Sequence, residues 1–259
     1  MTLQFKVYWS FRSPYSYLAT ARLAAFAEAH DVNVQLRIVR PLALRQADYF
    51  ERMGPLQRPY FLRDTARVAE YLGLPFRRPV PDPIQQDSVT LKLAAEQPYI
   101  RDLSHLGIEA SQRGAGIAYA DRVSRLLWDG SVDGWDQGKH MSKAAADSGL
   151  VHQEMRASID ADPQWYDRKL VEAEAELKAA GHWGVPCFVF NNEPFFGQDR
   201  FETFVWRLRQ HGLRVPVHWD SVGHVCPDHV CLSIGSFLDG RNTRLEPGDE
   251  GLPIPGTGQ

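Results

Sequence analysis

The chain has 259 residues, with 29 basic and 32 acidic side chains that give a formal net charge of −3 at pH 7. This length suits one large domain or two small ones, and a hydrophobic content of 44% is ordinary for a globular protein. The small net charge argues against nucleic acid or an anionic membrane surface as a partner. No apolar run reaches the length of a membrane-spanning helix, so we expect no membrane partner either.

The cysteine content and the first residues both bear on the compartment. Three cysteines, Cys187, Cys226 and Cys231, are too few for a disulfide framework. Residues 1–6 enter an alternating strand pattern directly, without the basic and then apolar layout of a signal peptide. We therefore expect a cytoplasmic protein.

The first forty residues predict a strand, a helix and a second strand. Residues 3–9 alternate as a strand does, with Leu3, Phe5, Val7 and Trp9 on one side. After a short break at residues 10–13, apolar residues recur at helical spacing up to Ala29, and a second alternating stretch covers residues 32–38. This order favours a parallel, right-handed crossover.

Helical patterns then dominate, broken by glycines and prolines, until strand signals return near residue 186. Asp162-Pro163 marks a helix start that closes at Gly181. Residues 186–190 and 194–197 form a predicted hairpin around Asn191-Asn192, and residues 201–210 form a last helix. The order β-α-β, helical block, β-β-α predicts an α/β fold with one mixed sheet and a large all-helical insertion.

The turn between the first strand and the first helix carries the motif Ser13-Pro14-Tyr15-Ser16. Free N–H groups and the positive end of the helix dipole stabilise negative charge at such a place. Thioredoxin-like proteins have Cys-x-x-Cys there, but here both positions are serine, which cannot form a disulfide. The alternative interpretation is structural, with Ser13 as the helix N-cap and Pro14 as the first helical residue.

Four segments together resemble a known family. They are FRSPYSYLA at 11–19, YFLRDTAR at 60–67, GVPCF at 184–188 and FGQDR at 196–200. In this order they resemble the 2-hydroxychromene-2-carboxylate isomerase family, which is related to kappa-class glutathione transferases and DsbA-type oxidoreductases. The resemblance covers residues 3 to 212. It implies a thioredoxin-like domain at 1–44 and 181–213, a helical insertion domain at 45–180, and a C-terminal tail at 214–259.

The resemblance also implies a glutathione site. Ser13 matches the catalytic residue that donates a hydrogen bond to the glutathione sulfur. Val185-Pro186 matches a cis-proline bond that leaves the Val185 backbone free to pair with glutathione as a strand edge does. Gln198 and Asp199 match the pair that holds the γ-glutamyl end. For Asp199, the alternative is a favourable acidic residue in the first turn of a helix.

Tyr60, Asp64 and Arg67 share one helix face by their i, i+4 and i+7 spacing. The resemblance implies that they bind substrate near the cleft, whereas an Asp64–Arg67 ion pair on a solvated face is the alternative. We expect scattered insertion residues to form the apolar substrate pocket, among them Tyr49, Phe50, Phe61 and Trp128.

The sequence departs from the family at two places. The asparagine and lysine that usually precede the Tyr60 helix are missing from residues 53–58, where Arg58 is a candidate to replace the lysine. Cys187 follows the proline where threonine is more usual. It is either a small buried residue or a thiol close to Ser13.

The function that the resemblance implies is a glutathione-dependent isomerase of an unsaturated aromatic degradation intermediate, in a homodimer. A kappa-like glutathione transferase or peroxidase and a non-catalytic binding protein are the alternatives. In the tail, His224, Cys226, His229 and Cys231 lie within eight residues. Their spacing matches no standard zinc module, and we expect no metal site.

Overall fold

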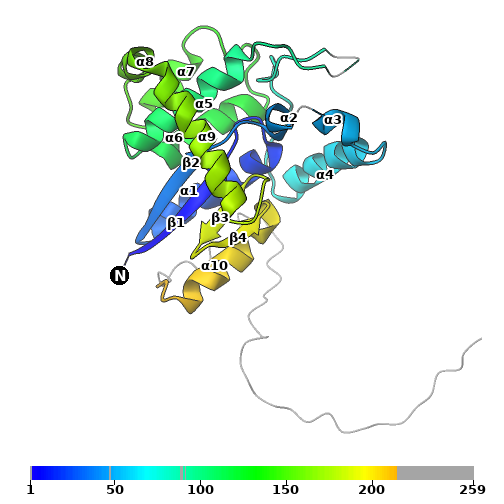
Figure 1. Ribbon diagram of the computed structural model, residues 1–259. Helices are drawn as coiled ribbons and strands as arrows, with labels where there is room; N and C mark the ends of the chain where they lie inside the picture. Colours follow the sequence, from blue (N-terminus) through cyan, green and yellow to red (C-terminus); the bar gives the residue numbers. More distant parts are fainter. Residues whose placement is uncertain (1, 47, 88–89, 91, 215–259) are drawn as a thin grey trace, which may run out of the picture. The chain divides into compact units, whose positions relative to one another are not determined.

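The computed structural model describes residues 2–46, 48–87, 90 and 92–214 (Figure 1). Its sheet has four strands, β1 (Leu3–Trp9), β2 (Val32–Ile38), β3 (Cys187–Phe190) and β4 (Glu193–Phe196), in the order β2-β1-β3-β4. β1 and β2 are parallel, whereas β1 pairs with β3, and β3 with β4, in antiparallel fashion. The predicted mixed sheet is confirmed.

One face of the sheet is covered by α1 (Pro14–Ala29) and α10 (Phe201–Gln210), which follows the short 3₁₀ turn η1 (Gln198–Arg200). Alternation along β1 sends Phe5, Val7 and Trp9 into this core, as predicted. Aromatic rings fill it, with the Phe204 ring centroid 4.8 Å from that of Phe5 in an edge-to-face contact.

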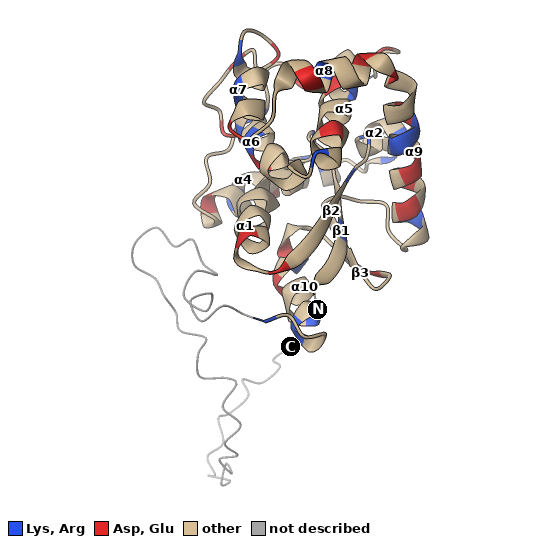
Figure 2. Cartoon of the chain, turned by 90° about the vertical axis from the view of Figure 1, so that its left-hand side faces the viewer, with Lys and Arg blue, Asp and Glu red and all other residues tan. Residues whose placement is uncertain are grey.

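The opposite face is covered by α9 (Pro163–Ala179), and Figure 2 shows α1 and α9 on opposite sides of the strands. Tyr8, Cys187 and Val189 point to this face and pack against Ala173 and Leu177. The predicted start of α9 is confirmed, because the Asp162 side chain accepts a hydrogen bond from the Trp165 N–H at 2.9 Å.

The helical block lies between β2 and α9 in the chain. Its helices are α2 (Leu42–Arg45), α3 (Tyr49–Arg52), α4 (Gln57–Tyr71), α5 (Pro98–Gln112), α6 (Gly116–Trp128), α7 (His140–Ala146) and α8 (His152–Ala161). α6 packs on α1, and α5 packs on β2, so these helices extend the core of the sheet. The domain boundaries at residues 44 and 181 stay a prediction. Within the described residues, no helix combines the length and apolarity needed to cross a membrane.

The described residues between α4 and α5 are irregular, apart from an isolated bridge between Gln86 and Leu93. Prolines concentrate in this stretch, and the Val80–Pro81 peptide bond is cis. The insertion is therefore helical on both sides of a proline-rich connection.

Gly107 allows α5 to approach the sheet closely. A Cβ atom at this position would lie 2.6 Å from Cε2 of Phe11 and 3.1 Å from Cδ1 of Ile38. Phe11 and Ile38 are both buried. The missing side chain thus sets the distance between α5 and the turn that leads into α1.

The predicted hairpin is confirmed in detail. Asn191 and Asn192 have φ angles of 50° and 63°, the left-handed pair that a two-residue hairpin turn requires. Asparagine tolerates this region better than most residues because its short polar side chain bonds locally. The turn brings β4 beside β3 and places Gly197 next to Pro186.

Candidate active site

Ser13 lies at the N-terminus of α1, beside the segment that leads into β3. Its Oγ accepts a hydrogen bond from the Ser16 N–H at 3.2 Å, so Ser13 is the N-cap of α1. The hydroxyl hydrogen points toward the carbonyl oxygen of Val185, 3.4 Å away. Because this second contact is long, the hydroxyl remains able to donate to a bound group.

The Val185–Pro186 peptide bond is cis, as expected. The Pro186 carbonyl accepts a hydrogen bond from the Gly197 N–H at 2.9 Å, which ties the segment to the end of β4. Among the described residues, none accepts a hydrogen bond from the Val185 N–H. The segment therefore presents a free backbone donor and a weakly engaged carbonyl beside Ser13.

A cleft of about 220 Å³ opens at this point, and Ser13, Tyr15 and Val185 line it. Trp183 and Phe196 form one aromatic wall. The His182 ring stacks on that of Phe196, with centroids 4.2 Å apart, and its Nδ1 accepts a hydrogen bond from the Gly184 N–H at 2.9 Å. The remaining lining residues are Ser10, Arg12, Pro14, Pro41, Leu42, Ala43, Arg45, Tyr49, Phe61 and Gly184.

The two other residues at redox-related positions are turned into the protein. Ser16, in the second cysteine position, is fully buried, and its Oγ has no partner among the described residues. Cys187 packs against α9 and does not line the cleft. Burial raises the pKa of its thiol to about 12. Of the two interpretations of Cys187, the structure therefore supports the small buried residue.

Tyr15, inside the motif, fastens α1 to α4. Its hydroxyl donates a 2.6 Å hydrogen bond to Oδ2 of Asp64, and its ring meets that of Phe61 edge-on at 5.4 Å. The hydrogen bond from Tyr15 lowers the pKa of Asp64, and Arg67 lowers it further. Partial desolvation acts in the opposite direction but is weaker. Burial and the same carboxylate raise the pKa of Tyr15. The sequence placed Asp64 near the cleft but did not indicate this partner.

The predicted Tyr60, Asp64 and Arg67 set is assembled on one face of α4. Arg67 donates to Oδ1 of Asp64 at 2.9 Å, and its guanidinium lies 5.8 Å from the Tyr60 ring centroid. Tyr60 is 62% exposed, and none of the three lines the cleft. Asp64 is thus held by an ion pair and by Tyr15, and the role of the set in substrate binding stays a prediction.

Gln198 and Asp199 lie in η1, at the end of the turn that follows β4. Gln198 is buried, and Arg22 of α1 donates to both its side-chain and backbone oxygens, the latter at 2.9 Å. Asp199 is exposed and pairs with the neighbouring Arg200 at 3.0 Å. The carboxylate of Asp199 is therefore accessible, whereas the oxygen of Gln198 is already engaged.

A smaller cavity of about 90 Å³ adjoins the cleft and shares Arg12, Pro14, Tyr49 and Phe61 with it. Trp128 and Phe76 also line it. Three of the four predicted pocket residues, Tyr49, Phe61 and Trp128, are therefore found here, while the side chain of Phe50 lies outside the described part of the chain.

The smaller cavity is positively charged. Arg12 and Arg78 share one carboxylate, Asp82, with Arg12 bound to both oxygens at 3.1 and 2.9 Å. Arg58 also lines the cavity and pairs with no described residue. Three guanidinium groups thus line the cavity, and one carboxylate, Asp82, pairs with two of them. Burial opposes ionisation of Asp82, but the bonds from Arg12 outweigh it and lower its pKa.

Arg45, which the sequence did not single out, also lines the cleft. Its Nε donates to the carbonyl of Arg40 and its Nη2 to the carbonyl of Trp183, both at 2.8 Å. Burial, and to a lesser degree the charge of Arg40, lowers its pKa. The nearby Glu174 is bound by both guanidinium arms of Arg40, so no described carboxylate pairs with Arg45.

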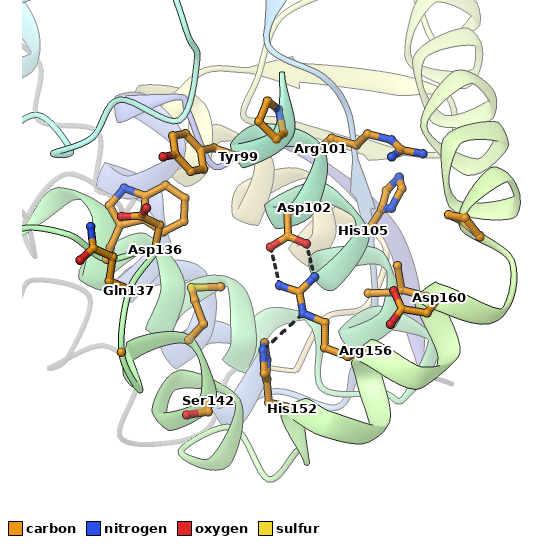
Figure 3. Close-up of a pocket in the computed structure, with 16 residues that line it drawn as sticks. Tyr99, Arg101, Asp102, His105, Asp136, Gln137, Ser142, His152, Arg156 and Asp160 are labelled. Carbon is orange, nitrogen blue, oxygen red and sulfur yellow. Dashed lines mark hydrogen bonds and ion pairs between the residues drawn. The ribbon is translucent and has the colours of Figure 1, made fainter. Parts of the chain in front are cut away.

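A separate cavity of about 520 Å³ lies among α5, α7, α8 and the start of α9 (Figure 3). Both of its arginines are already paired: Arg156 with Asp102, which also lines the cavity, and Arg101 with Asp167, which does not. Burial lowers the pKa of His105, which contacts Asp167 through Nε2 at 2.8 Å. None of the predicted site residues lies here. Within the described residues, no cluster of metal ligands occurs, and the His/Cys set of the tail lies outside them.

The mixed four-stranded sheet, the serine-capped helix and the facing cis-proline define a thioredoxin-fold protein with serines at both positions of its redox motif. A family model described as the DSBA-like thioredoxin domain matches residues 4–209. The chain belongs to that family, which confirms the DsbA-like resemblance and the α/β thioredoxin-like fold class with its helical insertion.

Solved structures agree with this assignment. A 2-hydroxychromene-2-carboxylate isomerase superposes with a TM-score of 0.56 at 20% identity, covering 81% of this chain and 97% of that one. A probable DsbA oxidoreductase from Streptomyces coelicolor has a TM-score of 0.56 at 24% identity, covering 83% and 92%. The cytosolic disulfide reductase DsbM from Pseudomonas aeruginosa with GSH gives 0.50 at 15%, covering 80% and 100%. No curated protein matches the chain. At these identities the likeness shows the fold.

Proposed function

We propose that the protein is a glutathione-dependent isomerase that acts on an unsaturated aromatic compound at the Ser13 cleft. The observation that carries the proposal is the Ser13 hydroxyl, which caps α1 and still has its hydrogen directed across the cleft to the Val185 carbonyl. A donor at a helix N-terminus stabilises a thiolate, and the position lacks a cysteine of its own.

The described groups fit a small thiol peptide. The Val185 N–H is a free donor of the kind that an extended peptide backbone pairs with. Asp199 offers an exposed carboxylate at the entrance to α10, suited to an ammonium group. Glutathione has an extended peptide backbone and an ammonium group that match these two protein groups. DsbM, a protein of the same fold, has a structure with GSH.

When bound, glutathione supplies a thiolate that adds reversibly to an activated carbon–carbon double bond and leaves unchanged. Ser13 donates its hydrogen bond to the sulfur and lowers the thiol pKa from its ordinary value of about 8.5. The aromatic side chains of Trp183, Phe196 and Phe61 line the cleft and pack against an aromatic compound. Arg12 lies at the junction of the two cavities with Nε and Nη2 bound to Asp82, so its Nη1 is the atom that donates to a conjugated oxygen on which negative charge develops.

Ser13→Ala and Ser13→Thr test the proposal. Thermal unfolding of the wild type with glutathione, S-methylglutathione and glutathione disulfide measures binding, because a ligand at 100 times its dissociation constant adds about 2.7 kcal/mol of stability. Thiolate absorbance against pH then gives the pKa of the bound thiol. We expect this pKa to lie below 8.5 in the wild type and in Ser13→Thr, and to rise in Ser13→Ala.

Turnover on 2-hydroxychromene-2-carboxylate completes the test. We expect Ser13→Ala to lose about 100-fold or more in kcat, as removal of one electrostatic donor does, and Ser13→Thr to retain most of it. Full turnover by Ser13→Ala would contradict the role of Ser13. Net loss of free thiol during the reaction would instead support a transferase, and binding without turnover on any electrophile would support a binding protein.

A further inference from the structure

Arg45 is a fixed cation in the cleft without a counter-charge. Two backbone carbonyls, those of Arg40 and Trp183, hold its guanidinium through Nε and Nη2. Its Nη1 donates to no described residue. A guanidinium keeps its charge at neutral pH, and it binds carboxylates through two parallel N–H groups.

The surrounding charges do not neutralise Arg45. Glu174 is the carboxylate that acts on it, but Glu174 receives Nε and Nη2 of Arg40 at 2.8 and 2.6 Å, and the Arg40 backbone N–H at 3.0 Å. Arg40 and Glu174 together carry no net charge. The site at Arg45 therefore has one unpaired positive charge, in a half-buried position where an anion is held more strongly than in water.

The position of Arg45 within the cleft indicates which anion it meets. It bonds to Trp183, two residues before Val185, and lines the cleft with Gly184 and Val185. Asp199 comes after the cis-proline and β4 and begins the entry to α10. In the proposed function the thiol faces Ser13 and the ammonium faces Asp199, whose charge acts on Tyr15 of the cleft lining. The other end of the tripeptide then lies toward Arg45, which lines the cleft together with residues 183–185.

We infer that Arg45 is a specificity-determining residue that binds the glycyl carboxylate of glutathione. The inference rests on the proposed function, because it takes glutathione as the molecule in the Ser13 cleft. Arg45 reaches the cleft from the last turn of α2.

The test compares two probes, glutathione and its glycyl monoethyl ester, which differ only in the carboxylate that Arg45 meets. Dissociation constants are measured by calorimetry for the wild type, Arg45→Gln, Arg45→Lys and the control Arg52→Gln. Arg52 is exposed on α3 and pairs with Asp48, and neither residue lines the cleft. We expect the wild type and Arg52→Gln to bind glutathione about 10-fold or more tightly than the ester, as a charge-assisted bond predicts.

In Arg45→Gln we expect this preference to vanish through weaker binding of glutathione, with the affinity for the ester unchanged. Arg45→Lys keeps the charge but loses the planar, two-pronged guanidinium, so it should retain part of the preference for glutathione over the ester. Equal loss of affinity for both probes in Arg45→Gln would show that Arg45 only supports the cleft wall, and an undiminished preference would also overturn the inference. If the wild type binds neither probe, the proposed function itself fails.

Discussion

The hydroxyl of Ser13 has one hydrogen to donate and two lone pairs to accept with. The Ser16 N–H uses one lone pair. The hydrogen faces the Val185 carbonyl in a long hydrogen bond, so a stronger acceptor can replace that carbonyl. The structural and functional interpretations of Ser13 are therefore compatible. A residue that caps a helix through its lone pair keeps its hydrogen for a ligand.

Asp64 gives a second prediction at the residue scale. Asp64→Asn removes a charged acceptor from the bond with Tyr15 and from the ion pair with Arg67. We expect the free energy of unfolding at pH 7 to fall by about 1–2 kcal/mol, because charge-assisted bonds in partly buried sites contribute that much. Urea denaturation measures it.

Tyr60→Phe is the matched control for Asp64→Asn. It deletes a hydroxyl that is exposed and 3.4 Å from the same carboxylate, so stability should change by less than about 0.5 kcal/mol. Equal effects of the two substitutions would contradict the assignment of Tyr15 as the main partner of Asp64.

These residues show what the sequence can and cannot predict at a site. The spacing of Tyr60, Asp64 and Arg67 predicted their common face, because helix geometry relates residues three and four apart. The bond from Tyr15 to Asp64 spans 49 residues and depends on how α4 packs on α1. Arg45 was missed because its partners are backbone carbonyls, which carry no sequence signal.

At the scale of elements, the close packing of α5 on the sheet depends on Gly107. Gly107→Ala should improve helix propensity by up to about 1 kcal/mol, yet its Cβ would overlap the buried ring of Phe11. Overpacking of a core typically costs about 1–3 kcal/mol. We therefore expect a net loss of stability, visible as a lower midpoint in urea.

Gly54→Ala provides the comparison for Gly107→Ala. No atom lies within 4 Å of a Cβ placed at Gly54, so this substitution should be neutral or slightly stabilising. If both substitutions prove neutral, then α5 can move away from Phe11 without loss, and the close approach has no energetic role.

The elements themselves were predictable where their signals are local. The alternation in β1, the proline after Ser13 and the asparagine pair before β4 all act within a few residues. The packing of α5 on β2 and of α6 on α1 was not predictable, because apolar helix faces fit many partners. For that reason the sequence predicted an insertion but not that it would share the core of the sheet.

At the scale of the whole molecule, several carboxylates are more acidic in the folded state than in the unfolded chain. Hydrogen bonds from Arg101 and His105, stronger than the opposing desolvation, lower the pKa of Asp167 to about 2. The other carboxylates with lowered pKa values are Asp64, Asp82 and Glu176. Below pH 5 the unfolded chain therefore binds more protons than the folded protein does.

The sign of the pH dependence follows from this difference. Stability from these groups is complete above their unfolded pKa values near 4 and is lost as the pH falls toward 2. We expect the urea midpoint to decrease steadily from pH 5 to pH 3. Asp167→Asn should lower the midpoint at pH 7 and make the decrease shallower. A midpoint independent of pH over this range would contradict the prediction.

The serine pair at positions 13 and 16 has a consequence for the surroundings of the cleft. A dithiol site alternates between a reduced and a disulfide form. The surface around it must therefore bind both the protein whose thiols it oxidises or reduces and the electron carrier that regenerates it. A site without thiols has one covalent state and needs no docking face for an electron carrier. In the proposed function, Trp183 and Phe196, both exposed at the rim, therefore contact one small ligand rather than a protein client.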